Sequence, residues 1–135
     1  EEDVTPVLCI GETKEDLQQG DRKLVLGEQL SIVFDRLKKN LEQVIIGYEP
    51  VWAIAGSGDG HVCSPEDVVE IHHWIKNKVK NYIDSEPEVV YGGSIESDNI
   101  LSYISLDEVD GILLGHASAN YGQFSSIVSK IKDYV

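Results

Sequence analysis

The sequence predicts an α/β protein made of four consecutive strand–helix units, which amounts to half of an eight-stranded parallel barrel. Short apolar runs alternate along the chain with longer segments whose apolar residues recur at helical spacing. The apolar runs are nearly continuous, which is typical of parallel strands buried on both faces. No linker, low-complexity tract or block of charge divides residues 1–135, so we expect one (β/α)4 domain.

The strands are predicted over residues 6–10, 44–48, 89–91 and 109–114. Each run is rich in aliphatic side chains and is followed at once by a glycine or by a polar residue and proline, which end a strand. Alone, four such strands would leave the first and last with unpaired backbone groups. They would also expose the side chains that fill the centre of a closed barrel.

The helices are predicted over residues 14–20 (a polar turn or short helix), from Asp21 to about residue 39, from Ser64 to before Pro87, over 98–104 and over 121–134. Asp21 is a suitable capping residue, because apolar residues follow it at steps of three and four. Ser64 offers a capping hydroxyl and Pro65 suits the first helical position, so this helix start is strongly specified.

Composition excludes several classes of partner. With 41% hydrophobic and 26% charged residues the chain is globular, and its formal net charge of −13 would repel nucleic acid. No apolar run approaches the roughly 20 residues of a membrane span, and the start does not resemble a signal peptide. Cys9 and Cys63 belong to no CxxC pair and the histidines have no metal-like spacing. We therefore expect a cytoplasmic protein with free thiols and without a metal.

A carboxylate stands where parallel α/β folds place their chemistry. Glu49 ends the predicted strand 44–48, and Pro50 stops the strand directly after it. The carboxyl ends of parallel strands carry the active sites of such folds. Position alone more often indicates a Glu that simply faces solvent, so other features have to support a catalytic role.

Two small loops follow the last two strands, Gly92-Gly93-Ser94 and Gly115-His116-Ala117-Ser118. Glycines let backbone N–H groups approach phosphate oxygens, and loops after the last two strands of an eight-stranded barrel often hold a phosphate. Residues 56–60 are also glycine-rich, but they do not fit GxGxxG and do not follow a strand, so a dinucleotide site is rejected.

The residues that carry these features resemble triosephosphate isomerase. The matching stretches are Cys9-Ile10-Gly11-Glu12, Tyr48-Glu49-Pro50-Val51-Trp52-Ala53-Ile54, Tyr91-Gly92-Gly93-Ser94, and Asp110-Gly111 through Ala117-Ser118. They occur in the family's order, and they resemble its second half, strands five to eight. The resemblance implies a (β/α)4 half of a TIM barrel, without a cofactor, acting on a triose phosphate.

The resemblance also implies individual roles. Glu49 would be the general base that moves a proton between adjacent carbons of dihydroxyacetone phosphate and glyceraldehyde 3-phosphate. The phosphate would be held by Gly56, Ser94, Gly115 and His116. The lid, residues 50–60, and its latch would involve Trp52 as hinge, Ala55, Gly58 and Tyr91. Cys9 would lie near Glu49, where we expect it to serve in core packing.

Two departures from the family pattern bear on the site. The loop between Trp52 and Pro65 is longer than the usual lid, which leaves open whether Ala55 or Gly56 contacts the phosphate. His116 stands where the family usually has a second glycine. It would weaken binding if the backbone is strained there, or add a charge-assisted contact when protonated; we expect a neutral or mildly unfavourable effect.

The family's catalytic lysine, asparagine and histidine lie in the half that this sequence does not contain. We therefore expect one subunit of a split triosephosphate isomerase, which a complementary N-terminal half-barrel chain would complete. The alternatives are a catalytically inactive half-barrel that self-associates through its open edges, and a fragment of a full-length isomerase. A half-barrel acting on another sugar phosphate is a further alternative, which the intact segment 48–54 disfavours.

Overall fold

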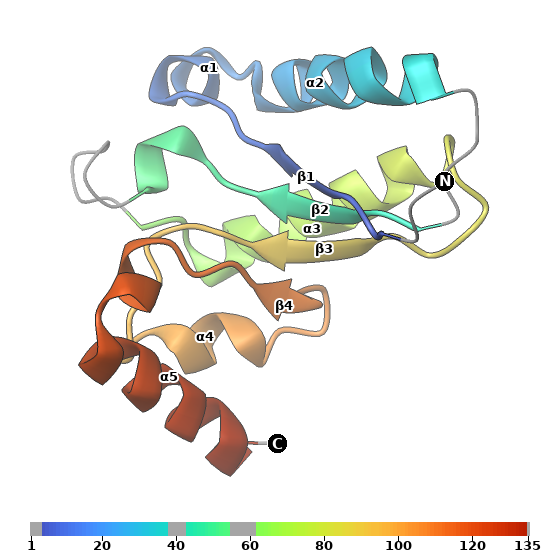
Figure 1. Cartoon of the computed structure of the whole chain (residues 1–135). Coiled ribbons are helices and arrows are strands. Elements are labelled where there is room, and N and C mark those ends of the chain that lie inside the picture. Colours follow the sequence, from blue (N-terminus) through green and yellow to red (C-terminus); the bar gives the residue numbers. More distant parts are fainter. Residues whose placement is uncertain (1–3, 38–42, 55–61, 135) are drawn as a thin grey trace.

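The computed structural model describes residues 4–37, 43–54 and 62–134. Its centre is a four-stranded parallel sheet in the order β1 (Val7–Ile10), β2 (Ile45–Tyr48), β3 (Glu88–Tyr91) and β4 (Gly111–Ile112). The strands lie side by side in chain order (Figure 1). Each crossover therefore advances by one strand in the same direction, as in the wall of a β/α barrel. The predicted α/β class and parallel sheet are confirmed.

The helices are α1 (Lys14–Gln19), α2 (Arg22–Leu37), α3 (Pro65–Val79), α4 (Ile100–Ile104) and α5 (Tyr121–Tyr134), with 3-10 turns η1 (Val51–Ala53) and η2 (His116–Ala119). In Figure 1, α3 lies behind the sheet while α2 and α5 lie beyond its two edge strands. Within the described ranges, no helix combines the length and apolar character that crossing a membrane requires.

Capping chemistry fixes two of the helix starts. The Ser64 hydroxyl accepts the N–H of Asp67 at 3.1 Å, and Pro65 opens α3 as predicted. Thr13 and Asp16 form a reciprocal capping box on α1, which ends at Gly20 in the left-handed conformation with φ 82°. The polar stretch after β1 is therefore a true short helix.

One predicted strand is much shorter than expected. The apolar run 109–114 forms regular ladder structure only at Gly111–Ile112. Single hydrogen bonds extend the pairing on either side, from Asp110 N–H to the Val89 carbonyl at 3.0 Å and from Leu113 N–H to the Tyr91 carbonyl at 2.9 Å. Within the described ranges β4 is an edge strand, so no second neighbour there extends its ladder.

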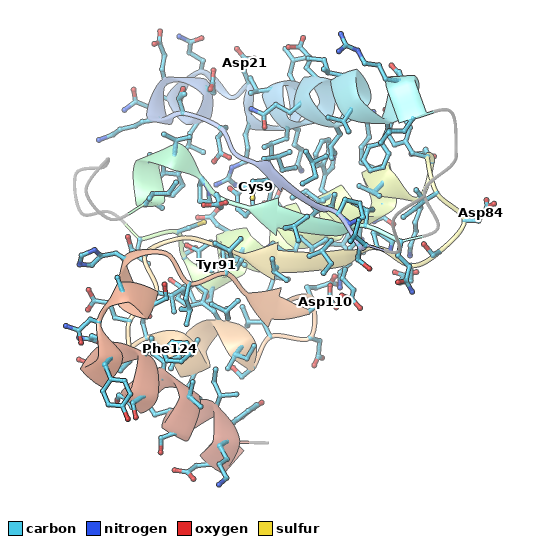
Figure 2. The ribbon with its side chains drawn as sticks, viewed as in Figure 1. Cys9, Asp21, Asp84, Tyr91, Asp110 and Phe124 are labelled. Atoms are coloured by element: carbon cyan, nitrogen blue, oxygen red, sulfur yellow. The ribbon has the colours of Figure 1, made fainter. Side chains whose placement is uncertain are left out.

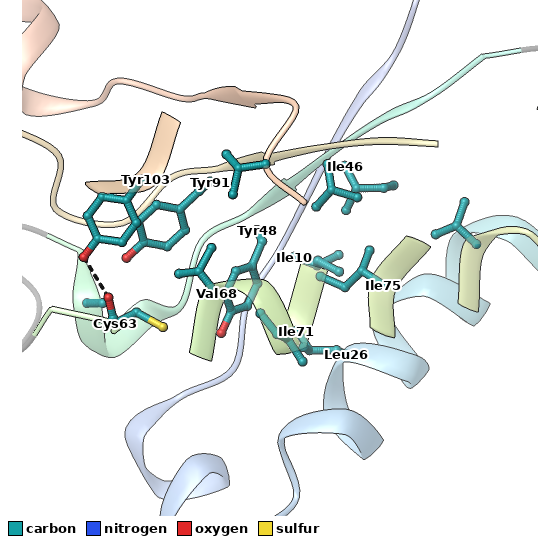
Figure 3. Packing of buried hydrophobic residues seen from close by; sticks show 14 of the residues in the cluster. Ile10, Leu26, Ile46, Tyr48, Cys63, Val68, Ile71, Ile75, Tyr91 and Tyr103 are labelled. Carbon is teal, nitrogen blue, oxygen red and sulfur yellow. Dashed lines mark hydrogen bonds between the residues drawn. The ribbon is translucent and has the colours of Figure 1, made fainter. Parts of the chain in front are cut away.

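The core lies between the sheet and the helices. The register aligns Ile10, Tyr48, Tyr91 and Ile112 across the strands, and these side chains point to the helix-covered face. Figure 3 shows Tyr48 and Ile46 close to the side chains that α3 contributes, Val68, Ile71 and Ile75. Tyr48 and Tyr91 are among the largest fully buried side chains, so aromatic burial anchors this layer.

The opposite face of the sheet is uncovered near β1. Val7 is 52% exposed and Cys9 is also exposed, although both lie in an apolar run. The register places Cys9, Gly47, Val90 and Gly111 at one level of this face. Burial on both faces, which the apolar runs predict, is thus reached on one face only, as expected for four strands without a second layer.

Candidate active site

Glu49 is held at the carboxyl edge of the sheet by its backbone. Its N–H donates to the Ile10 carbonyl at 2.8 Å, directly beyond the last residue of β2. Two glycines leave room for it: a Cβ on Gly11 would lie 1.8 Å from the Glu49 carbonyl oxygen, and a Cβ on Gly92 would lie 2.6 Å from Glu49 Cγ. The carboxylate is half-buried, so it faces a partly desolvated space.

A cavity of about 250 Å³ opens beside this carboxylate. Its walls come from the residues that follow β2, β3 and β4, namely Glu49, Ile54, Gly92, Gly93, Ser94, Ile95, Glu96, Gly115, His116, Ala117, Asn120 and Gln123. Four sequence-predicted site residues therefore meet in one place: Glu49, Ser94, Gly115 and His116. The volume suits a small polar molecule rather than a large cofactor.

Ser94 lines the cavity with its polar groups already engaged. Its N–H and its hydroxyl both donate to the Ala53 carbonyl, at 2.8 and 2.7 Å, and its own carbonyl accepts from Asn99 at 2.9 Å. The loop after β3 is thereby tied to η1. An anion that required the Ser94 N–H would have to displace the Ala53 carbonyl.

The loop after β4 offers freer donors. Among the described residues, the N–H groups of Gly115 and His116 donate to no carbonyl or side chain outside their own turn. His116 begins η2 and its side chain is exposed. A 3-10 turn is open to any residue, so the replacement of a glycine by His116 does not require a strained backbone.

The structure reveals a functional candidate that sequence reasoning missed, the buried carboxylate of Glu12. It is fully buried. It accepts hydrogen bonds from Arg22 Nε at 3.1 Å, Trp52 Nε1 at 2.8 Å and the Tyr48 hydroxyl at 3.1 Å. The signal available in the sequence was the position of Glu12, which, like Glu49, comes just after an apolar strand. Trp52, the predicted lid hinge, is thus anchored to the rigid end of β1.

Burial and the Glu12 charge raise the pKa of the Tyr48 hydroxyl far above its usual range. Desolvation disfavours the phenolate, and the adjacent carboxylate disfavours it further. The Tyr48 hydroxyl therefore stays protonated and donates its hydrogen bond to Glu12. This bond holds the side chain of Tyr48, which directly precedes Glu49 in the chain.

Tyr91 lies on the covered face of the sheet and is fully buried. Its ring stacks on Tyr103 with centroids 4.8 Å apart, and the Tyr103 hydroxyl donates to the Cys63 carbonyl at 2.7 Å (Figure 3). The Tyr91 hydroxyl itself has no hydrogen bond of regular geometry within the described part of the chain. The latch role expected for Tyr91 stays a prediction.

Cys9 is exposed on the open sheet face, so the expected packing role is not fulfilled within this chain. It lies beside Gly47, where a Cβ would stand 3.1 Å from the Cys9 sulfur. Partial burial, followed by a hydrogen bond to Glu49 and the charge of that carboxylate, raises the pKa of the Cys9 thiol to about 11. Figure 2 labels Cys9 on β1, which is an outer strand of the sheet. No cluster of three His, Cys, Asp or Glu side chains that could hold a metal ion occurs among the described residues.

Comparison with known proteins agrees with this geometry. The sequence model of the family described as triosephosphate isomerase matches residues 1–131, nearly the whole chain. The chain belongs to the triosephosphate isomerase family.

Individual triosephosphate isomerases are similar over the same stretch. That of Francisella tularensis subsp. tularensis is 41% identical over 131 residues, covering 94% of this chain and 51% of the relative. That of Francisella philomiragia subsp. philomiragia is 43% identical with the same coverage. That of Blochmanniella floridana is 37% identical and is covered over 49% of its length. The chain thus spans about half the length of the curated triosephosphate isomerases that it matches.

The remaining site residues that the resemblance to triosephosphate isomerase implies fall into two groups, those described away from the cavity and those outside the described residues. Trp52 and Tyr91 lie outside the cavity wall, one bound to Glu12 and one in the core. Ala55, Gly56 and Gly58, predicted for the lid and the phosphate, lie outside the described residues.

Proposed function

We propose that this chain forms the C-terminal half of a triosephosphate isomerase barrel and supplies its catalytic base, Glu49. The observation that carries the proposal is the convergence of Glu49, Ser94 and Gly115 on one cavity at the carboxyl edge of the sheet. Membership in the triosephosphate isomerase family supports the reaction class, and the relatives bear that name.

In the proposed reaction, Glu49 takes a proton from one carbon of the triose phosphate and returns it to the neighbouring carbon. The carboxylate is suited to this step because it is half-buried and has a cavity of about 250 Å³ in front of it. Closing such a site around a substrate removes water and makes a carboxylate a stronger base. Gly11 and Gly92 would fix its position against the substrate carbons.

The phosphate group would lie at the other end of the cavity. The N–H groups of Gly115 and His116 support this placement, because they have no other partner outside their own turn in the described structure. The Ser94 N–H would join them after leaving the Ala53 carbonyl. A phosphate held by backbone donors leaves the reacting carbons facing Glu49.

The rest of the site would come from a complementary half-barrel with strands one to four. As the resemblance implies, it would carry the lysine, asparagine and histidine that polarise the substrate carbonyl. Three surfaces support such a complement: the uncovered sheet face, the open edges of β1 and β4, and apolar residues on the flanking helices. These exposed helix residues are Leu24, Ile32 and Leu37 on α2 and Tyr121, Phe124, Val128 and Tyr134 on α5.

We place the complement on a second polypeptide, so the experiment is reconstitution. Isomerase activity is measured for this chain alone and for this chain titrated with a polypeptide that contains strands one to four of a related triosephosphate isomerase. We expect activity only in the mixture, and a loss of at least about a thousandfold in Glu49→Gln, which removes the base. Glu28→Gln, on the exposed side of α2, is the matched control and should keep full activity. A folded mixture without activity would contradict the proposal and favour an inactive half-barrel.

A further inference from the structure

The only charged residue within the four described strands is Glu88, the first residue of β3. The register pairs Val7 with Ile45 and Ile45 with Glu88, so these three residues form one level of the sheet, at its amino-terminal end. Side chains alternate between the two faces along a strand, and Val89 and Tyr91 are buried on the helix-covered face. Glu88 therefore points to the open sheet face, where it is exposed beside two aliphatic neighbours.

Nothing in the described part of the chain neutralises the Glu88 carboxylate. No Lys, Arg or His side chain there forms an ion pair with it, and Lys80, which precedes the loop before β3, is already paired with Glu86 at 2.8 Å. A hollow of about 70 Å³ borders Glu88 and is lined also by Thr5 and Ile45. The end of a side chain from another polypeptide therefore has room beside the carboxylate.

Any layer that completes the barrel has to cover Glu88. Burying a carboxylate is strongly unfavourable unless a cation or hydrogen-bond donors face it. In a barrel built from two copies of this chain, the twofold axis would place two Glu88 carboxylates at the same height of one interior, where they repel each other. The formal net charge of −13 on each copy adds to this repulsion.

We propose that Glu88 selects the half-barrel that covers the open sheet face: it admits a half that presents an arginine or lysine at this level, and it opposes a second copy of this chain. The proposal rests on the proposed function for the existence of a complementary half. Arginine fits best, because its guanidinium stays charged when buried and can bond both carboxylate oxygens. Inward-pointing charges are one means by which β-proteins prevent unwanted association.

A charge swap within this chain tests the selection without the complementary half. Self-association is measured by sedimentation equilibrium for the wild type, for Glu88→Lys and for an equimolar mixture of the two. We expect the mixed dimer to have a dissociation constant at least about tenfold lower than that of either homodimer, because only the mixture brings opposite charges together. Glu86→Lys is the matched control, since it makes the same charge change on a side chain that is 67% exposed, and its mixture with the wild type should show no such preference.

The complementary half provides the second measurement. The polypeptide used for reconstitution is given an arginine in turn at each inward position near the amino ends of its strands, and its binding to this chain is measured by titration calorimetry. We expect one placement to tighten binding to the wild type by about tenfold and to leave binding to Glu88→Gln unchanged. Glu88→Gln keeps the shape of an exposed side chain, so it should fold like the wild type.

A mixture that associates no more tightly than the homodimers, or the same preference with Glu86→Lys, would overturn the proposal. Arginine-bearing halves that all bind the wild type and Glu88→Gln equally well would also overturn it. Isomerase activity separates the two proposals. An active reconstituted barrel that binds Glu88→Gln as tightly as the wild type refutes the role of Glu88 alone, whereas selective pairing without activity supports Glu88 and refutes the proposed reaction.

Discussion

The side chain of Glu49 lies directly over Gly92, so closely that a Cβ on residue 92 would stand 2.6 Å from Glu49 Cγ and 3.3 Å from its carboxyl carbon. The position of the proposed base is thus set by the residue that follows β3, on a different strand. A glycine is required at residue 92 because two segments approach each other closely there.

Gly92→Ala should therefore displace the carboxylate. We expect isomerase activity of the reconstituted barrel to fall by about a hundredfold, because a misplacement of about 1 Å is costly in a proton transfer. Stability should fall by only about 1–3 kcal/mol in urea unfolding, since a side chain can move aside. Gly27→Ala is the matched control: its Cβ would lie 3.7 Å from the Trp74 ring, so activity should be unchanged and α2 slightly stabilised. Equal activity in both variants would contradict this account.

The buried Glu12 carboxylate should be a major element of stability. Glu12→Ala would remove the 3.1 Å partner of Arg22, whose side chain is only 11% exposed, and would leave it paired only with the half-exposed Asp67 at 3.6 Å among the described residues. We expect a loss of about 3–5 kcal/mol in the free energy of unfolding, measured with urea. The exposed pair Lys23–Glu70 is the comparison: despite its 2.7 Å separation, Lys23→Ala should cost at most about 1 kcal/mol. A small effect of Glu12→Ala would mean that the carboxylate does not anchor this region.

The buried His72 should make the protein less stable in acid. Burial lowers the pKa of His72 to about 4, despite a hydrogen bond to the Glu108 carbonyl. The unfolded chain binds a proton near about pH 6.5 and the folded chain binds it only near pH 4, so stability is lost as pH falls between these values.

The measurement is urea unfolding at several pH values. His72→Gln should remove a slope of up to about 1.4 kcal/mol per pH unit. Identical slopes for the wild type and His72→Gln would show that another group controls the acid transition.

Cys9 should react slowly although it is exposed. Its thiol pKa is raised to about 11, first by partial burial and then by the neighbouring Glu49, so little thiolate exists near neutral pH. Glu49→Gln should lower this pKa and accelerate alkylation by iodoacetamide several-fold. The rate is measured in a Cys63→Ser background, since Cys63 is the other thiol. An unchanged rate in Glu49→Gln would show that the carboxylate does not act on Cys9.

Sequence reasoning located the features that depend on local chemistry. Ser64 and Pro65 mark the start of α3 correctly, because a cap needs only the hydroxyl and the next few residues. The order of strands and helices follows from hydrophobic periodicity. The run 109–114 was wrong in extent, because ladder length depends on neighbouring strands and β4 has only one in this chain.

Features that join distant segments could not be read from the sequence. Glu12 gains its role from Arg22, Tyr48 and Trp52, which lie 10 to 40 residues away along the chain. The engagement of Ser94 with Ala53 likewise depends on how two loops meet, 41 positions apart along the chain. Spacing indicates that such residues share an edge of the sheet, but not which donor satisfies which acceptor.

The level of the open sheet face formed by Cys9, Gly47, Val90 and Gly111 is unusually poor in side-chain volume. Two of its four positions have no side chain, and a Cβ on Gly47 would lie 3.1 Å from the Cys9 sulfur and 3.5 Å from Leu113 Cδ1. A covering layer with large aliphatic residues at this height would fill the hollow, whereas small ones would leave a void that costs about 1 kcal/mol per missing methyl group. The volume of the side chains that a partner places at this one level of the sheet would then decide which half-barrels can pair with this chain and which cannot.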